Sequence, residues 1–245
     1  MIRNNKVADL DIELKGGNVL IASDFHVPFQ DDKAVTAFEN IVSIEQPDIV
    51  IIAGDLVDMY MLSRFTKGEG RNPMEEISEA RDILKEIRES FKGDMYYVIG
   101  NHEQRLEKNI LTKAPEMASL LPDIFTLFKL DKLQIKGCGS ITINNNFFIK
   151  HGNLLGNKSG LSAIKEMENA YMSGASGHTH RLAKYIARKS GRKFVWMETG
   201  CLCSMQPEYM LNPNWQQGYA SIVFGTDGKV ITSGVHEIEE GKVIN

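Results

Sequence analysis

The segment DIVIIAGD, residues 48–55, decides the fold class of this chain. Its apolar, β-branched centre is too short for a helix, and a Gly-Asp pair ends it, so it predicts a short buried strand. Two further segments have the same form, NVLIASD at residues 18–24 and MYYVIGN at residues 95–101. All three predicted strands end in polar residues.

The segments between these strands have helical periodicity. Residues 32–46 and 73–91 each carry apolar side chains at helical spacing, and Pro73 suits the first turn of the second helix. Alternating strands and helices predict parallel pairing in an α/β sheet. Ligands of such sheets collect at the carboxyl ends of the strands.

The second half of the chain predicts more β-structure. Residues 104–130 have a helical pattern that breaks near Pro115 and Pro122. Three hairpins are expected after it, at residues 141–152, 181–200 and 219–238, with turns at an Asn-rich segment, at Ser-Gly and at Asp-Gly. Because we find no repeat or linker, we expect a single domain over residues 1–245, with an α/β half and a β-rich half.

Composition narrows the classes of protein. The formal net charge of −4 gives no basic field of the kind that grips long duplex nucleic acid. The N-terminus has no apolar signal region, and the longest apolar run, IVIIAG at residues 49–54, is too short to span a bilayer. Three cysteines without a disulfide spacing pattern indicate a reducing compartment. We expect a cytoplasmic protein with no membrane partner.

Five short motifs place polar side chains at the ends of apolar segments, and they contain five of the six histidines. Alone, the first three motifs are explained by turns or helix caps and His151 by a core or surface histidine, while for the GHTH pair a metal site and a structural role are equal alternatives. Together they predict one site, since His178 and His180 also point the same way in extended backbone. In SDFH, GDLVD, GNHE, KHG and GHTH, the polar residues are Asp24, His26, Asp55, Asp58, Asn101, His102, His151, His178 and His180.

Imidazole, carboxylate and carboxamide groups without a thiolate suit Mn²⁺, Fe²⁺ or Zn²⁺. The set is too large for one ion with open positions, but it suits two ions that share a carboxylate. Two ions about 3.5–4 Å apart can bind a bridging hydroxide and polarise a phosphoryl oxygen. The residues therefore favour hydrolysis of a phosphate ester, with two divalent cations as cofactors.

In their order along residues 24–180, the five motifs resemble those of the calcineurin-like metallophosphoesterase superfamily. The stretches GCLC and NWQQGYA are similar to small phage and bacterial members. The resemblance implies two stacked mixed β-sheets flanked by helices, an αββα sandwich. It also implies a metal-dependent phosphoric ester hydrolase.

The resemblance further implies a role for each motif residue. Asp55 would bridge the two ions, His102 would act as general acid, and Asp58 would orient His102. Independently of the resemblance, the position of Arg105 three residues after His102 predicts a contact with a substrate phosphate, although a solvated helix arginine is an equal alternative. The remaining metal ligands would be Asp24, His26 and His180 for the first ion, and Asn101, His151 and His178 for the second.

Several functions fit this site. We expect a phosphodiesterase that acts on a nucleotide or a nucleic-acid end and uses Mn²⁺, with Fe²⁺ and Zn²⁺ also compatible. A phosphomonoesterase or protein phosphatase on the same site is an alternative. A non-catalytic module on the same fold, like the retromer subunit that resembles these enzymes, is another.

Other features receive structural interpretations. The segment SRFTKGEGRNP at residues 63–73 is interpreted as a surface loop rather than a substrate-binding flap. Glu103 stands where Asp often closes the third motif, and it is not expected to bind metal. Two cysteines and two tryptophans are interpreted as small buried side chains and as core packing residues, respectively, rather than as binding residues. These residues are Cys201, Cys203, Trp196 and Trp215. No role is assigned to His236.

Overall fold

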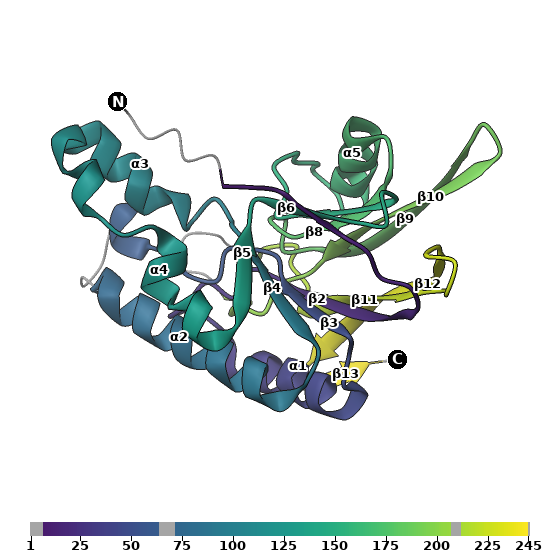
Figure 1. Ribbon diagram of the computed structural model, residues 1–245, viewed down its shortest axis with the longest axis horizontal. Coiled ribbons are helices and arrows are strands. Elements are labelled where there is room, and N and C mark those ends of the chain that lie inside the picture. The colour runs from purple at the N-terminus through teal and green to yellow at the C-terminus, as the bar shows by residue number, and fades with distance from the viewer. Residues whose placement is uncertain (1–6, 64–71, 207–211, 245) are drawn as a thin grey trace.

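The computed structural model describes residues 7–63, 72–206 and 212–244. Two β-sheets pack face to face, and helices cover the outer face of each (Figure 1). The predicted αββα sandwich is therefore confirmed. Among the described residues, no helix combines the length and apolar character needed to cross a membrane.

The larger sheet has seven strands in the order β13-β12-β11-β2-β3-β4-β5. Strands β2 to β5 are mutually parallel, and β11 pairs antiparallel with β2. The strands are β2 (Gly17–Ala22), β3 (Ile49–Ile52), β4 (Asp94–Val98), β5 (Ile135–Cys138), β11 (Gly218–Phe224), β12 (Val230–Glu239) and β13 (Lys242–Ile244).

The smaller sheet has six strands in the order β1-β6-β7-β8-β10-β9. Strands β7, β8 and β10 are mutually parallel. The strands are β1 (Leu10–Ile12), β6 (Ser140–Ile143), β7 (Phe147–Lys150), β8 (Ser173–Ser176), β9 (Leu182–Lys189) and β10 (Arg192–Thr199).

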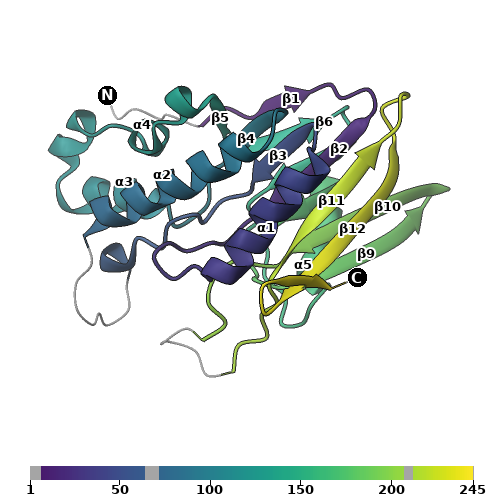
Figure 2. The same cartoon turned by 90° about the horizontal axis from the view of Figure 1, so that it is seen from below.

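Helices α1 and α2 lie across the outer face of the seven-stranded sheet, and Figure 2 shows them from that side. Asp31 caps α1 by accepting hydrogen bonds from two main-chain N–H groups, and Asn72 caps α2 ahead of Pro73. The α-helices are α1 (Asp32–Glu45), α2 (Pro73–Ser90), α3 (Gln104–Lys113), α4 (Ile124–Phe128) and α5 (Leu161–Ala170). The 3₁₀ helices are η1 (Tyr60–Leu62), η2 (Pro115–Leu120) and η3 (Leu130–Leu133).

The central strands of the larger sheet, β2, β3 and β4, are buried on both faces along most of their length, which explains their apolar sequences. In β2, Val19 and Ile21 face the smaller sheet, whereas Leu20 and Ala22 face the helices. On the outer side of the smaller sheet, α5 packs against Trp196 of β10. Burial on both faces fixes the position of each strand end, and the site lies at those ends.

The predicted strands, helices and hairpins are confirmed, including the breaks near Pro115 and Pro122. As expected, the first half of the chain alternates strands and helices and the second half is mostly β-structure, but the two halves share the larger sheet, because the hairpin β11–β12 extends the parallel strands through β2. The elements β1, β5, α5, β8 and β13 were not expected. The four strands are short or rich in Gly and Ser, so they carry little periodicity.

Candidate metal centre

Polar residues from both sheets meet at one edge of the sandwich. They follow the carboxyl ends of β2, β3 and β4 in the larger sheet and of β7 and β8 in the smaller sheet. All seven side chains expected to bind metal lie there; five are buried, and Asn101 and His178 are partly buried. They are Asp24, His26, Asp55, Asn101, His151, His178 and His180.

The backbone at this edge is strained at five of these positions. Non-glycine residues seldom adopt positive φ, and such strain concentrates at functional sites. In this site the conformation turns each side chain inward from the end of a strand. The residues and their φ values are Asp24 (57°), His26 (54°), Asp55 (50°), His178 (71°) and His180 (56°).

Three side chains form a first cluster, Asp24, His26 and His180. The Nε2 atoms of His26 and His180 are 2.9 Å apart. Asp24 Oδ1 is 3.3 Å from His180 Nε2 and 3.7 Å from His26 Nε2. Three donor atoms of two kinds therefore face one point.

A second cluster forms around His151. Its Nε2 atom is 3.1 Å from Asn101 Oδ1 and 3.3 Å from His178 Nδ1. Asp55 Oδ2 is 3.1 Å from the same His151 nitrogen and 3.9 Å from His26 Nε2 in the first cluster. The carboxylate of Asp55 thus lies between the two clusters, at the bridging position.

Hydrogen bonds from the other ring nitrogens orient two of these imidazoles. His151 Nδ1 lies 2.9 Å from the main-chain oxygen of Ala53, and His26 Nδ1 lies 3.1 Å from Asp58 Oδ1. Because an oxygen of this kind accepts the Nδ1 proton, each Nε2 is the nitrogen left to bind a cation once its own proton has been displaced. Metal-binding histidines are commonly oriented in this way.

The charges of the site favour cations. Burial raises the pKa of Asp24, but His180 and His26 hold that pKa well below its usual range. Burial also acts on Asp55, and His151 and His102 lower its pKa. Burial lowers the pKa of His151, whereas Asp55 raises it to about 9. The two buried carboxylates therefore remain negative at neutral pH.

His102 lies at the edge of the clusters, where its ring forms a further group of potential ligand atoms with His26 and Asp55. Its Nδ1 is 3.1 Å from Asp58 Oδ1, and its Nε2 is 3.7 Å from Asp55 Oδ2. Arg105 donates to His102 Nε2 at 2.6 Å and to the main-chain oxygen of Asp58 at 2.7 Å. Since the guanidinium can only donate, His102 Nε2 is the acceptor and Nδ1 carries the proton.

Glu103 has a role that the sequence did not indicate. Its buried carboxylate accepts hydrogen bonds from four main-chain N–H groups, those of Asp55, Leu56, Val57 and Gly100, at 2.8–3.2 Å. It therefore joins the second motif to the third. As expected, it does not point into the clusters.

Two glycines allow the motifs to approach one another. A Cβ atom at Gly100 would collide with the main chain and carboxylate of Asp55. One at Gly177 would collide with Ser23 and with the carboxylate of Asp24. Glycine is needed at both positions because the strand ends are packed against each other here.

The residues fit a pair of divalent cations. Asp24 Oδ1 is fully buried and accepts no hydrogen bond within the described part of the chain. A buried carboxylate oxygen without a donor is costly unless a cation neutralises it. Oxygen and nitrogen donors in two adjacent clusters, joined by one carboxylate, match the chemistry expected from the sequence.

The remaining candidates have different outcomes. Trp196 is fully buried, as expected, and donates to Ser176 Oγ at 3.0 Å. Core packing is the wrong interpretation for Trp215, which is only partly buried. The centroid of its ring lies 4.2 Å from that of the His180 ring. His236 stacks on Tyr219 of β11, outside the two clusters. The basic segment at residues 64–71 lies outside the described residues.

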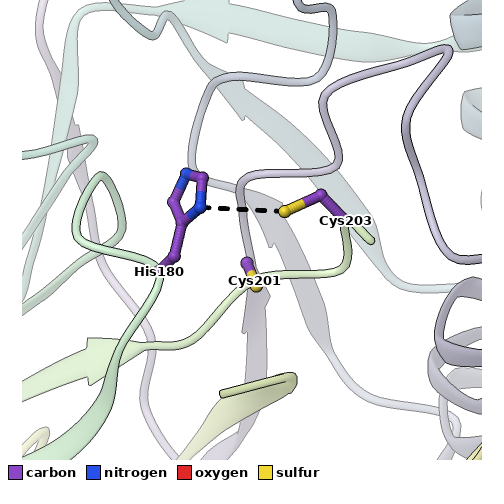
Figure 3. A group of neighbouring side chains, drawn as sticks. All are labelled: His180, Cys201 and Cys203. Carbon is purple, nitrogen blue, oxygen red and sulfur yellow. Dashed lines mark hydrogen bonds between the residues drawn. The ribbon is translucent and has the colours of Figure 1, made fainter. Parts of the chain in front are cut away.

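Cys201 and Cys203 are buried, as expected, but they also contact the site (Figure 3). Cys203 Sγ is 3.7 Å from His180 Nδ1, on the opposite side of the ring from Asp24. The sequence predicted only small buried side chains at these two positions, whereas the structure places Cys203 against His180. The spacing of CLC, which repeats the i, i+2 spacing of HTH, was the available signal.

Comparisons with known proteins agree with this geometry. A family model for calcineurin-like phosphoesterases matches residues 17–184. Gene 54 protein of Mycobacterium phage L5 is 27% identical over 246 residues, covering 91% of this chain and 94% of the relative. Gene 54 protein of Mycobacterium phage D29 is 29% identical over 226 residues, covering 82% of this chain and 86% of the relative.

Solved structures share the fold. Vacuolar protein sorting 29 from Cryptosporidium parvum superposes with a TM-score of 0.53 at 17% identity, covering 94% of this chain and 96% of that chain. Vps29 from Entamoeba histolytica in complex with zinc gives a TM-score of 0.50 at 15% identity, covering 93% and 96%. At these identities the likeness concerns the fold alone.

Proposed function

The chain belongs to the calcineurin-like phosphoesterase family, and we propose that it is a two-metal phosphodiesterase acting on a nucleotide or a nucleic-acid end. One observation carries the proposal. Asp55 Oδ2 lies between two clusters of buried donors that come from five different strand ends. Buried polar side chains gathered in this way are explained by the binding of two cations better than by a role in core packing.

The side chains of the site would each have a defined role in binding the two ions. Asp55 would be shared between the ions, with Mn²⁺ as the expected metal. When bound, the two cations supply Lewis-acid activation of water and neutralise charge that develops on the phosphoryl group. The other groups that hold the ions are Asp24, His26 and His180 for the first, and Asn101, His151 and His178 for the second.

His102 is placed to move a proton at the leaving oxygen. Its Nε2 faces the clusters, and its Nδ1 is held by Asp58. Arg105 now donates to that Nε2, so His102 can act as an acid only after Arg105 turns away. A substrate phosphate supplies a stronger acceptor for the guanidinium than a neutral imidazole does, and this draws Arg105 toward the substrate.

Preference for a nucleotide or nucleic-acid end is supported by Trp215. Its partly exposed indole lies against His180, a group of the first cluster. An aromatic face beside the reacting phosphate can stack a nucleobase, an interaction that is tolerant of sequence. The acidic net charge favours a short substrate over a long duplex.

The test is hydrolysis of bis-p-nitrophenyl phosphate and of p-nitrophenyl phosphate, with and without added Mn²⁺. We expect Mn²⁺-dependent turnover with the diester preferred, and loss of turnover in Asp55→Asn. A preferred monoester would replace the diesterase assignment by a phosphomonoesterase, with phosphoproteins as the next substrates to test. No hydrolysis of either ester in Mn²⁺-loaded protein would contradict the proposal and favour a non-catalytic module.

A further inference from the structure

The segment Cys201-Leu202-Cys203 presents two sulfurs to one face and a leucine to the other. Leu202 is fully buried in the core beneath α1 and α2. Main-chain hydrogen bonds from Leu202 N to Asp24 O and from Cys201 N to Gln216 O hold the segment in place. Because side chains alternate in extended backbone, both cysteines point away from that core, and Figure 3 shows Cys203 directed at His180.

The two sulfurs and one ring nitrogen of His180 lie within 4.8 Å of one another. Cys203 Sγ is 3.7 Å from His180 Nδ1, and Figure 3 shows the contact. All three residues are buried, with exposed fractions of 0% for Cys201, 3% for Cys203 and 7% for His180. This cluster is distinct in chemistry from the two oxygen- and nitrogen-rich clusters beside it.

We propose that Cys201 Sγ, Cys203 Sγ and His180 Nδ1 form a third cation site, one for a soft divalent ion such as Zn²⁺ or Cd²⁺. Thiolate ligands select soft ions over Mn²⁺. Binding replaces the two thiol protons, which leave to solvent, by two metal–sulfur bonds. Two thiolates and one divalent cation sum to zero charge, and a neutral group is what a buried site tolerates.

His180 connects this site to the candidate metal centre. Its Nε2 faces Asp24 and His26, and its Nδ1 faces Cys203. A neutral imidazole carries one proton, so only one of its nitrogens has a free lone pair. A soft ion on Nδ1 leaves the proton on Nε2 and removes His180 from the first cluster. The third site thus opposes metal loading of the phosphodiesterase centre.

The test is a titration of the metal-free full-length protein with Cd²⁺, followed by the thiolate-to-cadmium charge-transfer absorption in the ultraviolet. The chain has three cysteines, which gives a matched control. Cys138, buried in β5, donates to the main-chain oxygen of Tyr97 and lies outside the cluster. We expect one equivalent of the thiolate band in wild type and in Cys138→Ser, and its loss in Cys201→Ser and Cys203→Ser.

Absence of the band in wild type would overturn the site, and so would a band that persists when Cys201 and Cys203 are both serine. Circular dichroism of each metal-free variant separates loss of the site from loss of the fold. A second arm adds Mn²⁺ and rests on the proposed function. We expect Mn²⁺ to weaken the apparent Cd²⁺ affinity several-fold. An unchanged affinity would refute the competition for His180, while the thiolate band still reports the third site independently of phosphoesterase activity.

Discussion

The imidazoles of His26 and His102 meet edge to face, with ring centroids 4.4 Å apart and ring planes at 78°. One atom, Asp58 Oδ1, lies 3.1 Å from the Nδ1 of each ring. One carboxylate therefore orients a proposed metal ligand and the proposed proton donor together. In the proposed function, metal binding and proton transfer would be coupled through Asp58, a residue that would touch neither the ion nor the substrate.

Replacing Asp58 by Asn should disturb both functions. The carboxamide keeps the size of the side chain but loses the charge that fixes two Nδ1 protons. We expect Mn²⁺ affinity and kcat each to fall by roughly 10–100-fold, as for other partners of metal ligands. Calorimetric Mn²⁺ titration and steady-state kinetics measure the two effects, and Asp82→Asn, an exposed position on α2, is the control. A fall in kcat with unchanged Mn²⁺ affinity would restrict Asp58 to His102.

Asp55→Asn should be more damaging than Asp58→Asn. Asp55 Oδ2 is the atom that lies between the two clusters, and a carboxamide is a weaker bridge between cations than a carboxylate. We expect a metal analysis to find one bound ion instead of two. We also expect kcat/KM to fall by more than the roughly 100-fold that is typical when a residue hydrogen-bonded to a metal ligand is replaced. Two tightly bound ions in the variant would show that Asp55 is not the bridge.

Glu103→Gln should reduce stability more than it changes substrate affinity. The carboxylate oxygens accept from four main-chain N–H groups, two on each oxygen. Glutamine would turn an NH₂ group toward two of them, and each buried donor left without an acceptor costs roughly 1–3 kcal/mol. Urea unfolding measures the loss, with Glu107→Gln at an exposed position of α3 as the control. Equal unfolding midpoints for the two variants would contradict this role.

Glu39 on α1 should make stability depend on pH. Burial, followed by Glu86 on α2, raises its pKa from 4.5 to about 7, and Glu39 Oε1 is buried without a hydrogen bond from the described residues. Between pH 4.5 and 7 the folded chain keeps a proton that the unfolded chain has released. The free energy of unfolding therefore falls as pH rises through this window.

In Glu39→Gln this contribution disappears. We expect the variant and wild type to differ least near pH 4.5, and the variant to be the more stable above pH 7. Urea unfolding at a series of pH values measures the difference, with Glu45→Gln at an exposed position of the same helix as the control. A constant difference between variant and wild type across the series would count against the raised pKa.

The sequence contained enough to identify the sheet and the residues at its edge. Three apolar segments end in Asp24, Asp55 and Asn101, and parallel strands bring their carboxyl ends together. The hairpins could also be predicted from the sequence, because their turns contain residue types that form tight turns. Ser190 and Gly191, for example, both adopt positive φ in the structure. Local signals of this kind depend on neighbours in the chain.

Only the tertiary structure decided which residues distant in the sequence contact one another or hydrogen-bond to the same atom. Nothing in GNHE indicates that Glu103 holds the turn after β3, and nothing in GCLC indicates that Cys203 faces His180. The same holds for Asp58, which serves His26 as well as His102. Periodicity reports which side of a strand or helix is buried. The partner on that side depends on how two sheets stack, and stacking is set by the whole core rather than by any one segment.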